Sequence, residues 1–427
     1  MTSSLAKAID VDRRPVEAVP LHVLTITPFF PSLENEVGGC FVEEPIDALS
    51  QAGISSTVIA VSPIYSRRRH PNPSAPAEWI RYPQFPGVSG LSTAGRFLYA
   101  RLRREILRLH HERPIDVIHA HAALPCGQAA SLLAERLGIP YVVTVHGLDV
   151  FNTCFHAGVQ AEWRRRASIA VYQRASNVIC VSRKVQQILQ SGTAAGVRST
   201  VVYNGTDAEL FSPHPATRST SNEAAGPSQQ EILIVGNLIP SKGQELVLRA
   251  IHRLAGSFPR LECRIIGEGP DLQRLEALAN ELGIRQRIHF LSRQSRAAVA
   301  DAMRRCSMFV LPSSNEGLGC VYLEAMACAK PVIACRGQGI EEIIEHQKNG
   351  WLISPDNPDD LQQAISTLLG SAELGSSKEG LPKLRSPRHA EQIGVAARQT
   401  ILDGLSLRQQ AHTLATVYRL SASSRAL

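Results

Sequence analysis

The stretch SSNEGLGCVYLEAMACAKPVIA, from Ser313 to Ala334, decides the fold of this chain. It follows an apolar run that ends at Leu311, opens with a glycine-containing loop, continues as a helix from near Gly319 and ends in a second apolar run. Strand, loop, helix and strand in this order form the repeating unit of a parallel sheet covered by helices. The stretch therefore predicts an α/β fold.

The same alternation of short apolar runs and helical segments continues along the chain in two series. The strands expected in the first series are Leu21–Thr27, Ser56–Val61, Asp116–Ala120, Tyr141–Val145, Asn177–Val181 and Thr200–Tyr203. Those expected in the second series are Glu231–Val235, Glu262–Gly267, Arg287–Leu291, Met308–Leu311, Pro331–Ala334 and Trp351–Ile353. Two doubly wound, Rossmann-like domains are predicted, with ligands bound in a cleft outside the carboxyl ends of the strands.

Composition marks the boundaries of these domains. With 427 residues, of which 44% are hydrophobic, the chain can fill two cores. We expect a polar, disordered leader at 1–20, an N-terminal domain at 21–212 and a linker rich in Ser, Pro, Thr, Ala and Gly at 213–230. A C-terminal domain at 231–405 and a closing amphipathic helix within 406–427 complete the chain.

Charge and cysteine content limit the kinds of partner and compartment. The net charge of +7 favours polyanions, but the positive charge is dispersed and no nucleic-acid-binding module is present, so nucleic acid is not an expected partner. The nine cysteines include no Cys-x-x-Cys pair, which favours buried thiols in a reducing compartment. With no signal peptide and no apolar run long enough to span a membrane, we expect a cytoplasmic protein, soluble or peripheral.

Two carboxylates in the opening stretch, Glu316 and Glu324, stand eight residues apart. The helical rise over that interval is about 12 Å, which is too far for one acid–base pair but suits two parts of an extended ligand. Phosphates would lie between them at the helix amino end, where the loop Gly317-Leu318-Gly319 offers backbone N–H donors. Taken alone, a solvated loop glutamate and a surface helix glutamate are the simpler interpretation.

Three further loops follow predicted strands. A glycine turn at Gly236, then Lys242 and a helix, can hold a diphosphate, although a plain turn with an exposed lysine is the alternative. The pair Gly38-Gly39 lets the backbone approach a phosphate closely, or forms an ordinary turn. His146, directly after a strand, either donates to a sugar oxygen or makes a structural hydrogen bond.

The stretch from Ser313 to Ala334 closely resembles the E-x7-E signature of the family-four retaining glycosyltransferases, and the other loops match that family's elements in order from about residue 21 to about residue 420. The resemblance implies a GT-B fold, with two Rossmann-like domains facing across a cleft. The acceptor would bind mainly to the first domain and the nucleotide sugar to the second, and the C-terminal helix would cross back onto the first domain.

The resemblance also implies roles for individual residues. Glu316 would contact hydroxyls of the donor sugar, Glu324 the ribose, and Lys242 the leaving diphosphate, while His146 would face the sugar. The catalytic residues implied are therefore His146, Lys242 and Glu316. The donor-binding residues implied are Gly38, Gly39, Gly236, Asn237, Lys242, Gly267, Glu268, Glu316, Gly317, Leu318, Gly319 and Glu324. His119 and His121 resemble the family's His-x-His run, with an acceptor-side or a structural role.

Asn237 is the main departure from the family, which has an arginine there to neutralise the diphosphate. We expect Lys242 to be the main cation, with Arg264, Arg293 or a residue of the N-terminal domain as the replacement for the arginine. No metal or other cofactor is expected, because Asp10-Val11-Asp12, the sole Asp-x-Asp, lies in the polar leader, away from the predicted cleft.

The predicted function is metal-independent, retaining transfer of a hexose from a nucleotide-diphosphate sugar (UDP first, GDP second) to a hydroxyl of a glycan or lipid-linked acceptor in cell-envelope polysaccharide or glycolipid synthesis. The arginine-rich segments 101–113 and 164–166 are either solvated helix faces or contacts to an anionic membrane surface, the inner face of the cytoplasmic membrane. The alternatives are a nucleotide-sugar epimerase of the same fold and a binding protein that has lost catalysis, for which Asn237 is the marker.

Overall fold

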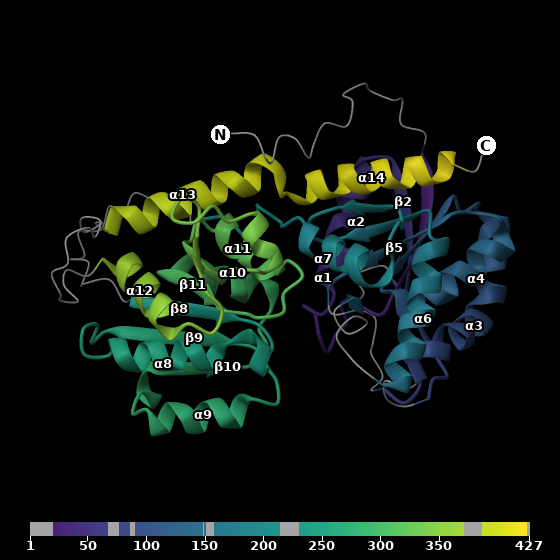
Figure 1. The fold of residues 1–427 in the computed structure, drawn as a ribbon. Coiled ribbons are helices and arrows are strands. Elements are labelled where there is room, and N and C mark those ends of the chain that lie inside the picture. Colours follow the sequence, from purple (N-terminus) through teal and green to yellow (C-terminus); the bar gives the residue numbers. More distant parts are fainter. Residues whose placement is uncertain are drawn as a thin grey trace.

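The computed structural model of this chain describes residues 20–66, 77–85, 90–147, 149–150, 158–213, 230–370 and 387–424. The predicted leader, apart from its last residue, lies outside the described residues, and so does the interior of the predicted linker. Figure 1 shows two α/β lobes side by side, with a band of C-terminal helix running over both. The prediction of two Rossmann-like domains is confirmed by the strand orders that follow.

The N-terminal domain contains a parallel sheet in the order β3-β2-β1-β4-β5-β6-β7. Its strands are β1 (Leu21–Thr27), β2 (Ile54–Pro63), β3 (Glu78–Tyr82), β4 (Val117–His121), β5 (Tyr141–Val145), β6 (Asn177–Cys180) and β7 (Ser199–Val201). Its helices are α1 (Cys40–Glu43), α2 (Pro45–Gln51), α3 (Leu91–Glu112), α4 (Gln128–Leu137), α6 (Val159–Arg174) and α7 (Arg183–Ile188), with π-helical turns at Ala123–Gly127 and Leu189–Thr193. The sequence analysis missed β3, because in this edge strand only Ile80 and Tyr82 are buried and no apolar run marks it.

The C-terminal domain contains a second parallel sheet, in the order β10-β9-β8-β11-β12-β13. Its strands are β8 (Gln230–Val235), β9 (Leu261–Ile266), β10 (Ile288–Leu291), β11 (Met308–Leu311), β12 (Val332–Cys335) and β13 (Trp351–Ile353). Its helices are α8 (Gln244–Leu254), α9 (Leu272–Glu281), α10 (Arg296–Arg305), α11 (Cys320–Ala327), α12 (Pro358–Leu369) and α13 (Pro387–Gly404), with 3-10 turns at Pro240–Lys242, Arg285–Arg287 and Gly339–Glu342. The helix α13, which the sequence analysis did not separate from its surroundings, packs on α11 and α12.

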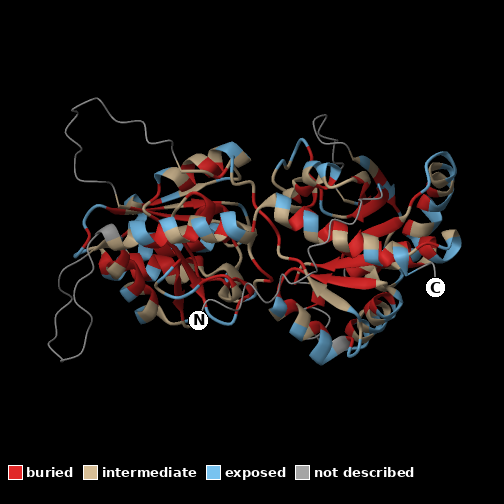
Figure 2. Cartoon of the chain, turned by 90° about the horizontal axis from the view of Figure 1, so that it is seen from above, coloured by how far each residue is buried: buried red, intermediate tan, exposed pale blue. Residues whose placement is uncertain are grey.

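Both sheets are buried on both faces. Every residue of β1, β4, β5 and β11 is buried, and Figure 2 shows the strands as the buried centre of each lobe. Helices cover both faces of a parallel sheet, so the side chains on both sides of each strand are buried. Such strands therefore appear in the sequence as nearly continuous apolar runs. This is why the predicted boundaries of β1, β5, β11 and β13 match the observed ones.

The last helix, α14 (Leu407–Ser423), crosses back onto the N-terminal domain, as the family resemblance implied. Its hydroxyl-bearing cap, Ser406, accepts a hydrogen bond from the N–H of Gln409. The buried face of the helix packs against α2 and the sheet. The buried apolar residues of this contact are Leu21, Val23, Leu49, Ile54, Val117, Val142, Ile179, Val202, Ala411, Leu414, Ala415, Val417 and Tyr418.

The two chain segments that cross between the domains lie side by side. Thr206, on the way out of the N-terminal domain, pairs in parallel with Ser406, just before α14. The N–H of Thr206 donates to Leu405 O at 3.0 Å, and a Cβ on Gly205 would lie 2.5 Å from the carbonyl oxygen of Ser406. The chain thus connects the two domains in both directions at one place.

The packing of α14 predicts a measurable contribution to the stability of the N-terminal domain. Leu414→Ala should lower the free energy of unfolding by about 2–4 kcal/mol, because the 5%-exposed side chain leaves a cavity among the strands. Leu420→Ala on the same helix, where the leucine is 53% exposed, should change it by less than about 0.5 kcal/mol. Urea unfolding followed by circular dichroism measures both. Equal effects of the two substitutions would contradict the docking of α14.

Candidate active site in the cleft between the domains

The cleft between the two sheets holds a cavity of about 1200 Å³, part of it open to solvent. The loops that follow β8, β9 and β11 line it, and β8 and β11 are the strands between which the order of the sheet reverses. Open α/β sheets bind ligands at this topological switch point. The residues around the cavity come from both domains and include Cys40, Phe41, His146, Asn204, Gly236, Asn237, Lys242, Gly267, Glu268, Arg293, Arg296, Glu316, Leu318, Gly319, Cys320 and Glu324.

Most of the site residues predicted from the sequence line this cavity. They are His146, Gly236, Asn237, Lys242, Gly267, Glu268, Glu316, Leu318, Gly319 and Glu324. Gly38, Gly39 and Gly317 do not line it, although they lie next to residues that do. Gly39 has a left-handed φ of 87°, and a Cβ there would lie 2.4 Å from the backbone between Phe29 and Phe30. Glycine is therefore needed at position 39 for packing within the N-terminal domain.

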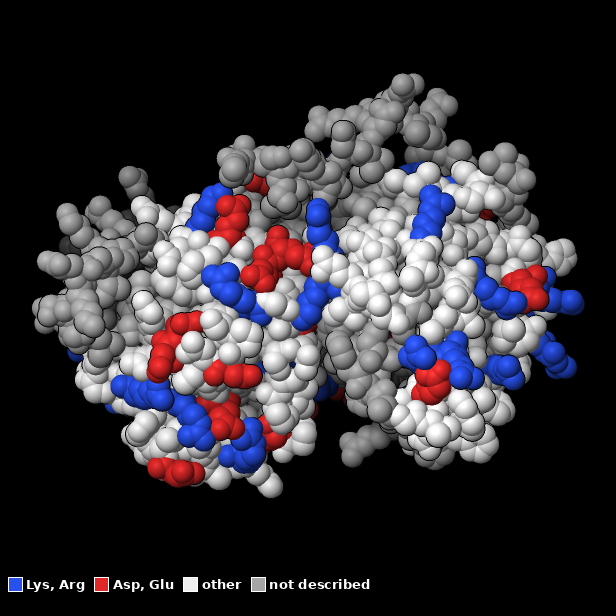
Figure 3. Space-filling view, viewed as in Figure 1, with Lys and Arg blue, Asp and Glu red and all other residues white. Residues whose placement is uncertain are grey.

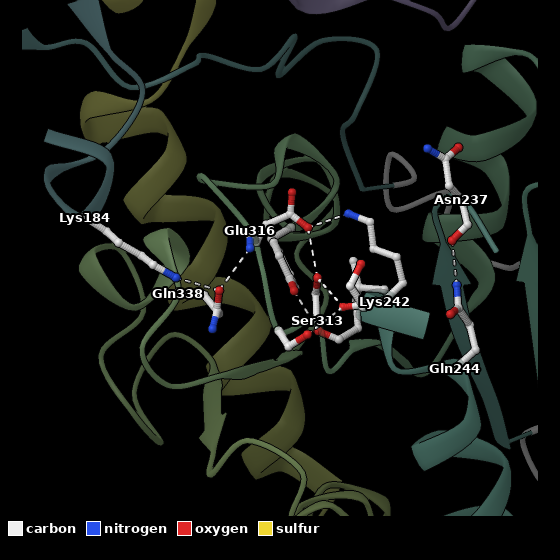
Figure 4. A network of polar contacts seen from close by, with 11 residues as sticks. Lys184, Asn237, Lys242, Gln244, Ser313, Glu316 and Gln338 are labelled. Carbon is white, nitrogen blue, oxygen red and sulfur yellow. Dashed lines mark hydrogen bonds and ion pairs between the residues drawn. The ribbon is translucent and has the colours of Figure 1, made fainter. Parts of the chain in front are cut away.

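Lys242 and Glu316 form an ion pair at the centre of the cavity. Lys242 Nζ lies 2.5 Å from Glu316 Oε2, and the Ser313 hydroxyl donates to the same oxygen at 3.2 Å (Figure 4). The lysine comes from the 3-10 turn before α8, and the glutamate from the loop between β11 and α11. The two side chains are only 20% and 16% exposed, so the pair is partly desolvated.

Glu316 is also tied to the N-terminal domain through Gln338. The side-chain oxygen of Gln338 accepts from the Glu316 N–H at 2.9 Å and from Lys184 Nζ at 2.8 Å (Figure 4). Lys184 lies in α7, and burial lowers the pKa of its ammonium, against the pull of neighbouring carboxylates. Beside it, Glu342 accepts from the N–H groups of Arg183 and Lys184 at the start of α7. The two domains therefore meet through polar contacts at the edge of the site.

At the other end of the cavity, Arg296 contacts carboxylates from both domains. One of its nitrogens lies 2.5 Å from Glu324 Oε1, another contacts Glu44 of the N-terminal domain, and the guanidinium lies 4.6 Å from the centre of the Phe211 ring. We call Glu44, Arg296 and Glu324 the interdomain triad. The sequence analysis missed Arg296. A signal was present, because an arginine in the first turn of a helix opposes the helix dipole and needs another reason to be there.

The two arginines proposed as replacements at Asn237 differ in position. Arg293 lines the cavity and pairs with Glu268 at 3.6 Å. Arg264 does not line it and pairs instead with Glu231 at the start of β8, so the suggestion of Arg264 is wrong. Asn237 itself is exposed on the cavity wall, and its backbone oxygen accepts from the Gln244 side chain (Figure 4).

Behind the cavity wall, three histidines stack on one another. The ring centroids of His121 and His146 are 5.2 Å apart, those of His119 and His121 4.4 Å, and His121 Nδ1 lies 3.0 Å from His146 Nε2. His119 is hydrogen-bonded to Thr144 and to Tyr418 of α14. Burial lowers the pKa of His146 to about 4 and that of His119 to about 3, and it lowers the pKa of His121 as well. All three are neutral near pH 7.

The loop after β5 holds His146 in place. Asp149 Oδ1 accepts from the N–H groups of His146, Gly147 and Val150 at 3.0 to 3.1 Å. Burial raises the pKa of this carboxyl to about 6, opposed by these hydrogen bonds. The neutral His146 imidazole can exchange hydrogen bonds with a ligand, but it does not supply positive charge.

Positive potential in the cavity comes also from backbone groups. The helices α8 and α11 begin beside the cavity, capped by Gly243 and Gly319, whose left-handed φ values are 73° and 84°. Unpaired N–H groups at a helix amino end attract anions, and here two such ends flank Lys242. The arrangement suits an anionic ligand with two or more phosphate oxygens.

The described residues contain no cluster of three or more His, Cys, Asp or Glu side chains that could hold a metal ion. The Asp-x-Asp motif of the polar leader, Asp10-Val11-Asp12, lies outside the described residues. No helix in the described part of the chain is both long and apolar enough to cross a membrane.

Comparison with protein families gives one match in each domain. A model of glycosyltransferase family 4 matches residues 41–210, and a model of glycosyl transferases group 1 matches residues 218–377. The second match covers the loops of Lys242, Glu316 and Glu324, and the first covers His146. Both domains thus carry the features of one enzyme class.

Individual relatives of this chain carry the names of glycosyltransferases, in agreement with the family matches. An uncharacterized glycosyltransferase of Methanocaldococcus jannaschii is 33% identical over 61% of this chain and 67% of the relative. A D-inositol 3-phosphate glycosyltransferase of Geodermatophilus obscurus is 28% identical over 97% of this chain and 94% of its own. A GDP-mannose-dependent phosphatidylinositol monomannoside mannosyltransferase of Mycolicibacterium smegmatis is 27% identical over 72% of this chain and 77% of its own.

Solved structures confirm the fold. A sucrose-phosphate synthase from Thermosynechococcus elongatus has a TM-score of 0.73 and 21% identity over 93% of this chain and 98% of its own. Anabaena HepE, solved with UDP-glucose, has a TM-score of 0.66 and 19% identity over 93% of this chain and all of its own. The GT-B architecture predicted from the sequence is confirmed.

The histidine stack predicts a pH effect on stability. Folded His119 stays neutral down to its pKa of about 3, while the unfolded side chain takes up a proton near pH 6.5. Its contribution is therefore lost as the pH falls below about 6.5. Relative to His119→Gln, the wild type should lose about 2 kcal/mol of unfolding free energy between pH 6.5 and pH 5. Urea unfolding at several pH values measures this. A constant difference between the two proteins would show that His119 titrates normally.

Proposed function

Because the chain belongs to the family-four, group 1 glycosyltransferases, we propose a specific form of that family's reaction. The enzyme transfers a hexose from a nucleotide-diphosphate sugar to a hydroxyl of a glycan or lipid-linked acceptor, retains the configuration at the anomeric carbon, and needs no metal. The observation that carries the proposal is the cavity at the switch point, with Lys242 and two helix amino ends in the middle and one glutamate on either side. The family match favours transfer over the epimerase alternative.

The donor occupies the cavity along its length in this proposal. The diphosphate lies between Lys242 and the amino ends of α8 and α11, where cationic and N–H donors converge. The ribose hydroxyls lie at Glu324, whose Oε2 is buried and finds no hydrogen-bond partner among the described residues. The sugar hydroxyls lie at Glu316 and His146 on the cavity wall.

The Lys242–Glu316 pair implies an exchange of partners when the donor binds. A partly buried ion pair has already given up part of its hydration, so the lysine can turn to a more highly charged diphosphate at little further desolvation cost. Glu316 is then free to accept from the sugar hydroxyls. In this proposal the pair holds both groups close to their places in the donor complex.

The charges that line the cavity support the proposal of retention without a metal. Cleavage of the anomeric carbon–phosphate bond builds negative charge on the leaving diphosphate, which Lys242 and the helix amino ends stabilise electrostatically. His146 is a weak base, because burial lowers its pKa to about 4. Glu268 and Glu324 contact cations, and Glu316 is assigned to the sugar hydroxyls, so the proposal gives none of these groups the role of general base. The leaving phosphate itself then takes the proton of the acceptor hydroxyl on the same face of the sugar.

We place UDP first and GDP second as the donor nucleotide. Anabaena HepE, which shares the fold, was solved with UDP-glucose, and the mannosyltransferase relative is named for GDP-mannose. The names of the relatives include inositol phosphate and phosphatidylinositol mannoside acceptors, which supports a phosphate-bearing or lipid-linked acceptor in cell-envelope glycan or glycolipid synthesis.

We also propose that the N-terminal domain rests on the anionic inner face of the cytoplasmic membrane. Arg96 of α3 and Trp163 and Arg166 of α6 line one surface groove, and Trp163 is 59% exposed. Figure 3 shows basic side chains with some acidic ones between them at the outer end of this domain, where Figure 1 places α3, α4 and α6. Basic helices with an exposed tryptophan favour anionic lipid surfaces. The eight cysteines in the described residues are free thiols, which suits the cytoplasmic side.

Nucleotide binding tests the donor site. UDP or GDP should bind to the wild type with the same affinity in the presence and absence of EDTA. Lys242→Ala and Glu324→Ala should each weaken binding about tenfold or more, because each removes a charged hydrogen bond to the ligand. Lys348→Ala, which removes an exposed lysine of the same domain, is the control. Isothermal titration calorimetry measures the dissociation constants.

Either of two results would contradict this part of the proposal. If neither nucleotide binds, the proposed diphosphate site is wrong. If binding is lost in EDTA, the proposal of metal independence is wrong. Once a donor and an acceptor are identified, the anomeric proton coupling of the product in NMR gives its configuration. An inverted product would exclude the retaining mechanism.

Vesicle binding tests the membrane contact. The double variant Arg96→Glu/Arg103→Glu reverses two exposed charges on α3 and should weaken binding to phosphatidylglycerol vesicles about tenfold or more, since each cation near such a surface contributes about 1 kcal/mol. The control Arg305→Glu/Lys348→Glu makes the same charge change on the C-terminal domain. Sedimentation at low and high salt measures binding. Equal behaviour of the two variants would exclude a contact through α3.

A further inference from the structure

The interdomain triad joins two groups that belong to different halves of the enzyme. Glu324 lies in α11 of the C-terminal domain and is 3% exposed, while Glu44 lies between α1 and α2 of the N-terminal domain. Arg296 stands between them and contacts both carboxylates. One arginine thus connects the ribose end of the proposed donor site to the domain that faces it.

The two oxygens of Glu324 have different surroundings. Oε1 lies 2.5 Å from Arg296 Nη1, whereas Oε2 is buried without a hydrogen-bond partner within the described residues. Glu324 and Arg296 both line the cavity. An unpartnered buried carboxylate oxygen is costly, and a ribose hydroxyl at that place would satisfy it. The contact with Arg296 fixes the rotation of the carboxyl group that leaves Oε2 for the ligand.

The stacking on Phe211 fixes Arg296 in turn. The guanidinium carbon lies 4.6 Å from the centre of that ring, and Phe211 is fully buried a few residues after the crossing at Thr206. Arg304 of the same helix α10 contacts the backbone oxygens of Leu210 and Ser212. The segment after the crossing is therefore anchored on the C-terminal domain, and Arg296 stays with that domain when the cleft opens.

Opening of the cleft would separate Arg296 from Glu44 but not from Glu324. The arginine would keep Glu324 and Phe211, which are held on its own domain, and would lose its contact across the cleft. Burial raises the pKa of the Glu44 carboxyl to about 7, and Arg296 opposes this rise. Closing therefore restores the cation that this buried acidic group needs as a partner. The contact between the domains at the ribose end of the cavity is favourable only while Arg296 is present, because without the arginine two acidic side chains meet there.

We infer that Arg296 is a positioning residue that couples donor binding to closure of the two domains: it orients Glu324 for the ribose and holds Glu44 of the opposite domain at the same time. The inference rests on the proposed donor site. A ligand that favours the closed arrangement binds more weakly when that arrangement is less populated, so damage to the triad lowers nucleotide affinity even where the damaged residue does not contact the nucleotide.

A rescue experiment tests the coupling. Arg296→Met should weaken UDP binding about tenfold or more and increase the radius of gyration in X-ray scattering, because Glu44 and Glu324 then face each other without a cation. Adding Glu44→Gln to that variant removes the buried acidic group that has lost its cation, and the double variant should regain about threefold or more of the lost affinity and part of the compactness. Arg305→Met, an exposed arginine of the same helix, should leave both quantities unchanged.

The orientation of Glu324 has its own readout. The wild type should bind UDP more tightly than 2′,3′-dideoxy-UDP, and this preference should shrink in Arg296→Met, because the glutamate is no longer aimed at the ribose. If UDP is not the ligand, GDP and its dideoxy form are used in the same way. If Arg296 has only a structural role, Arg296→Met should weaken the binding of UDP and of its dideoxy form by the same factor.

The outcomes separate the inference from the function on which it rests. If the wild type binds UDP or GDP and the double variant is no better than Arg296→Met, the coupling through Glu44 is wrong while the donor site stands. If the wild type binds neither nucleotide, the proposed donor site is wrong, and so is the coupling of donor binding to domain closure through Arg296. Rescue of both affinity and compactness by Glu44→Gln supports the inference.

Discussion

The two domains meet through backbone contacts that leave no room for a side chain. A Cβ on Gly317 would lie 2.4 Å from the carbonyl oxygen of His146 in the other domain, and, inside the C-terminal domain, a Cβ on Gly339 would lie 1.7 Å from the oxygen of Gly317. Within the second domain, a Cβ on Gly267 would lie 2.0 Å from Gly236 O. Real Cβ atoms do not approach so closely, so glycine at these positions lets the loops after β5, β8, β9, β11 and β12 come together. The contacts of Lys242, Glu316 and Gln338 lie in or beside the loops that this approach brings together.

Side-chain contacts hold both ends of the cleft. Lys184 and Gln338 hold the Glu316 loop from one side, and the interdomain triad holds the Glu324 end from the other. The paired crossing at Thr206 and Ser406 adds a backbone connection between the same two domains. A donor would therefore meet a site whose walls are nearly in place, which reduces the ordering cost of binding.

The fold was predictable because most of the buried strands are short, largely apolar runs that alternate with helical segments, and α14 was predictable because its apolar positions recur with helical spacing. The cavity positions of Lys242, Glu316 and Glu324 were predictable too, since parallel strands bring their carboxyl-end loops together. The roles of Arg296 and Gln338 were not, because Glu44 and Lys184, their partners in the other domain, lie far away in the sequence. The place of Arg296 in the first turn of its helix marks it as unusual, but it does not name the partner. The edge strand β3 was missed for lack of an apolar run.

The charges of the cavity explain what Asn237 changes. Among the described lining residues, each of the cations Lys242, Arg293 and Arg296 contacts one lining carboxylate, on Glu316, Glu268 and Glu324 respectively. An arginine at position 237 would add a positive charge that none of these carboxylates balances, whereas asparagine leaves the empty cavity balanced. Attraction for a diphosphate then has two sources in this chain, the helix amino ends and the release of Lys242 from Glu316. Donor affinity should accordingly depend more steeply on Lys242 here than in a relative that has the arginine.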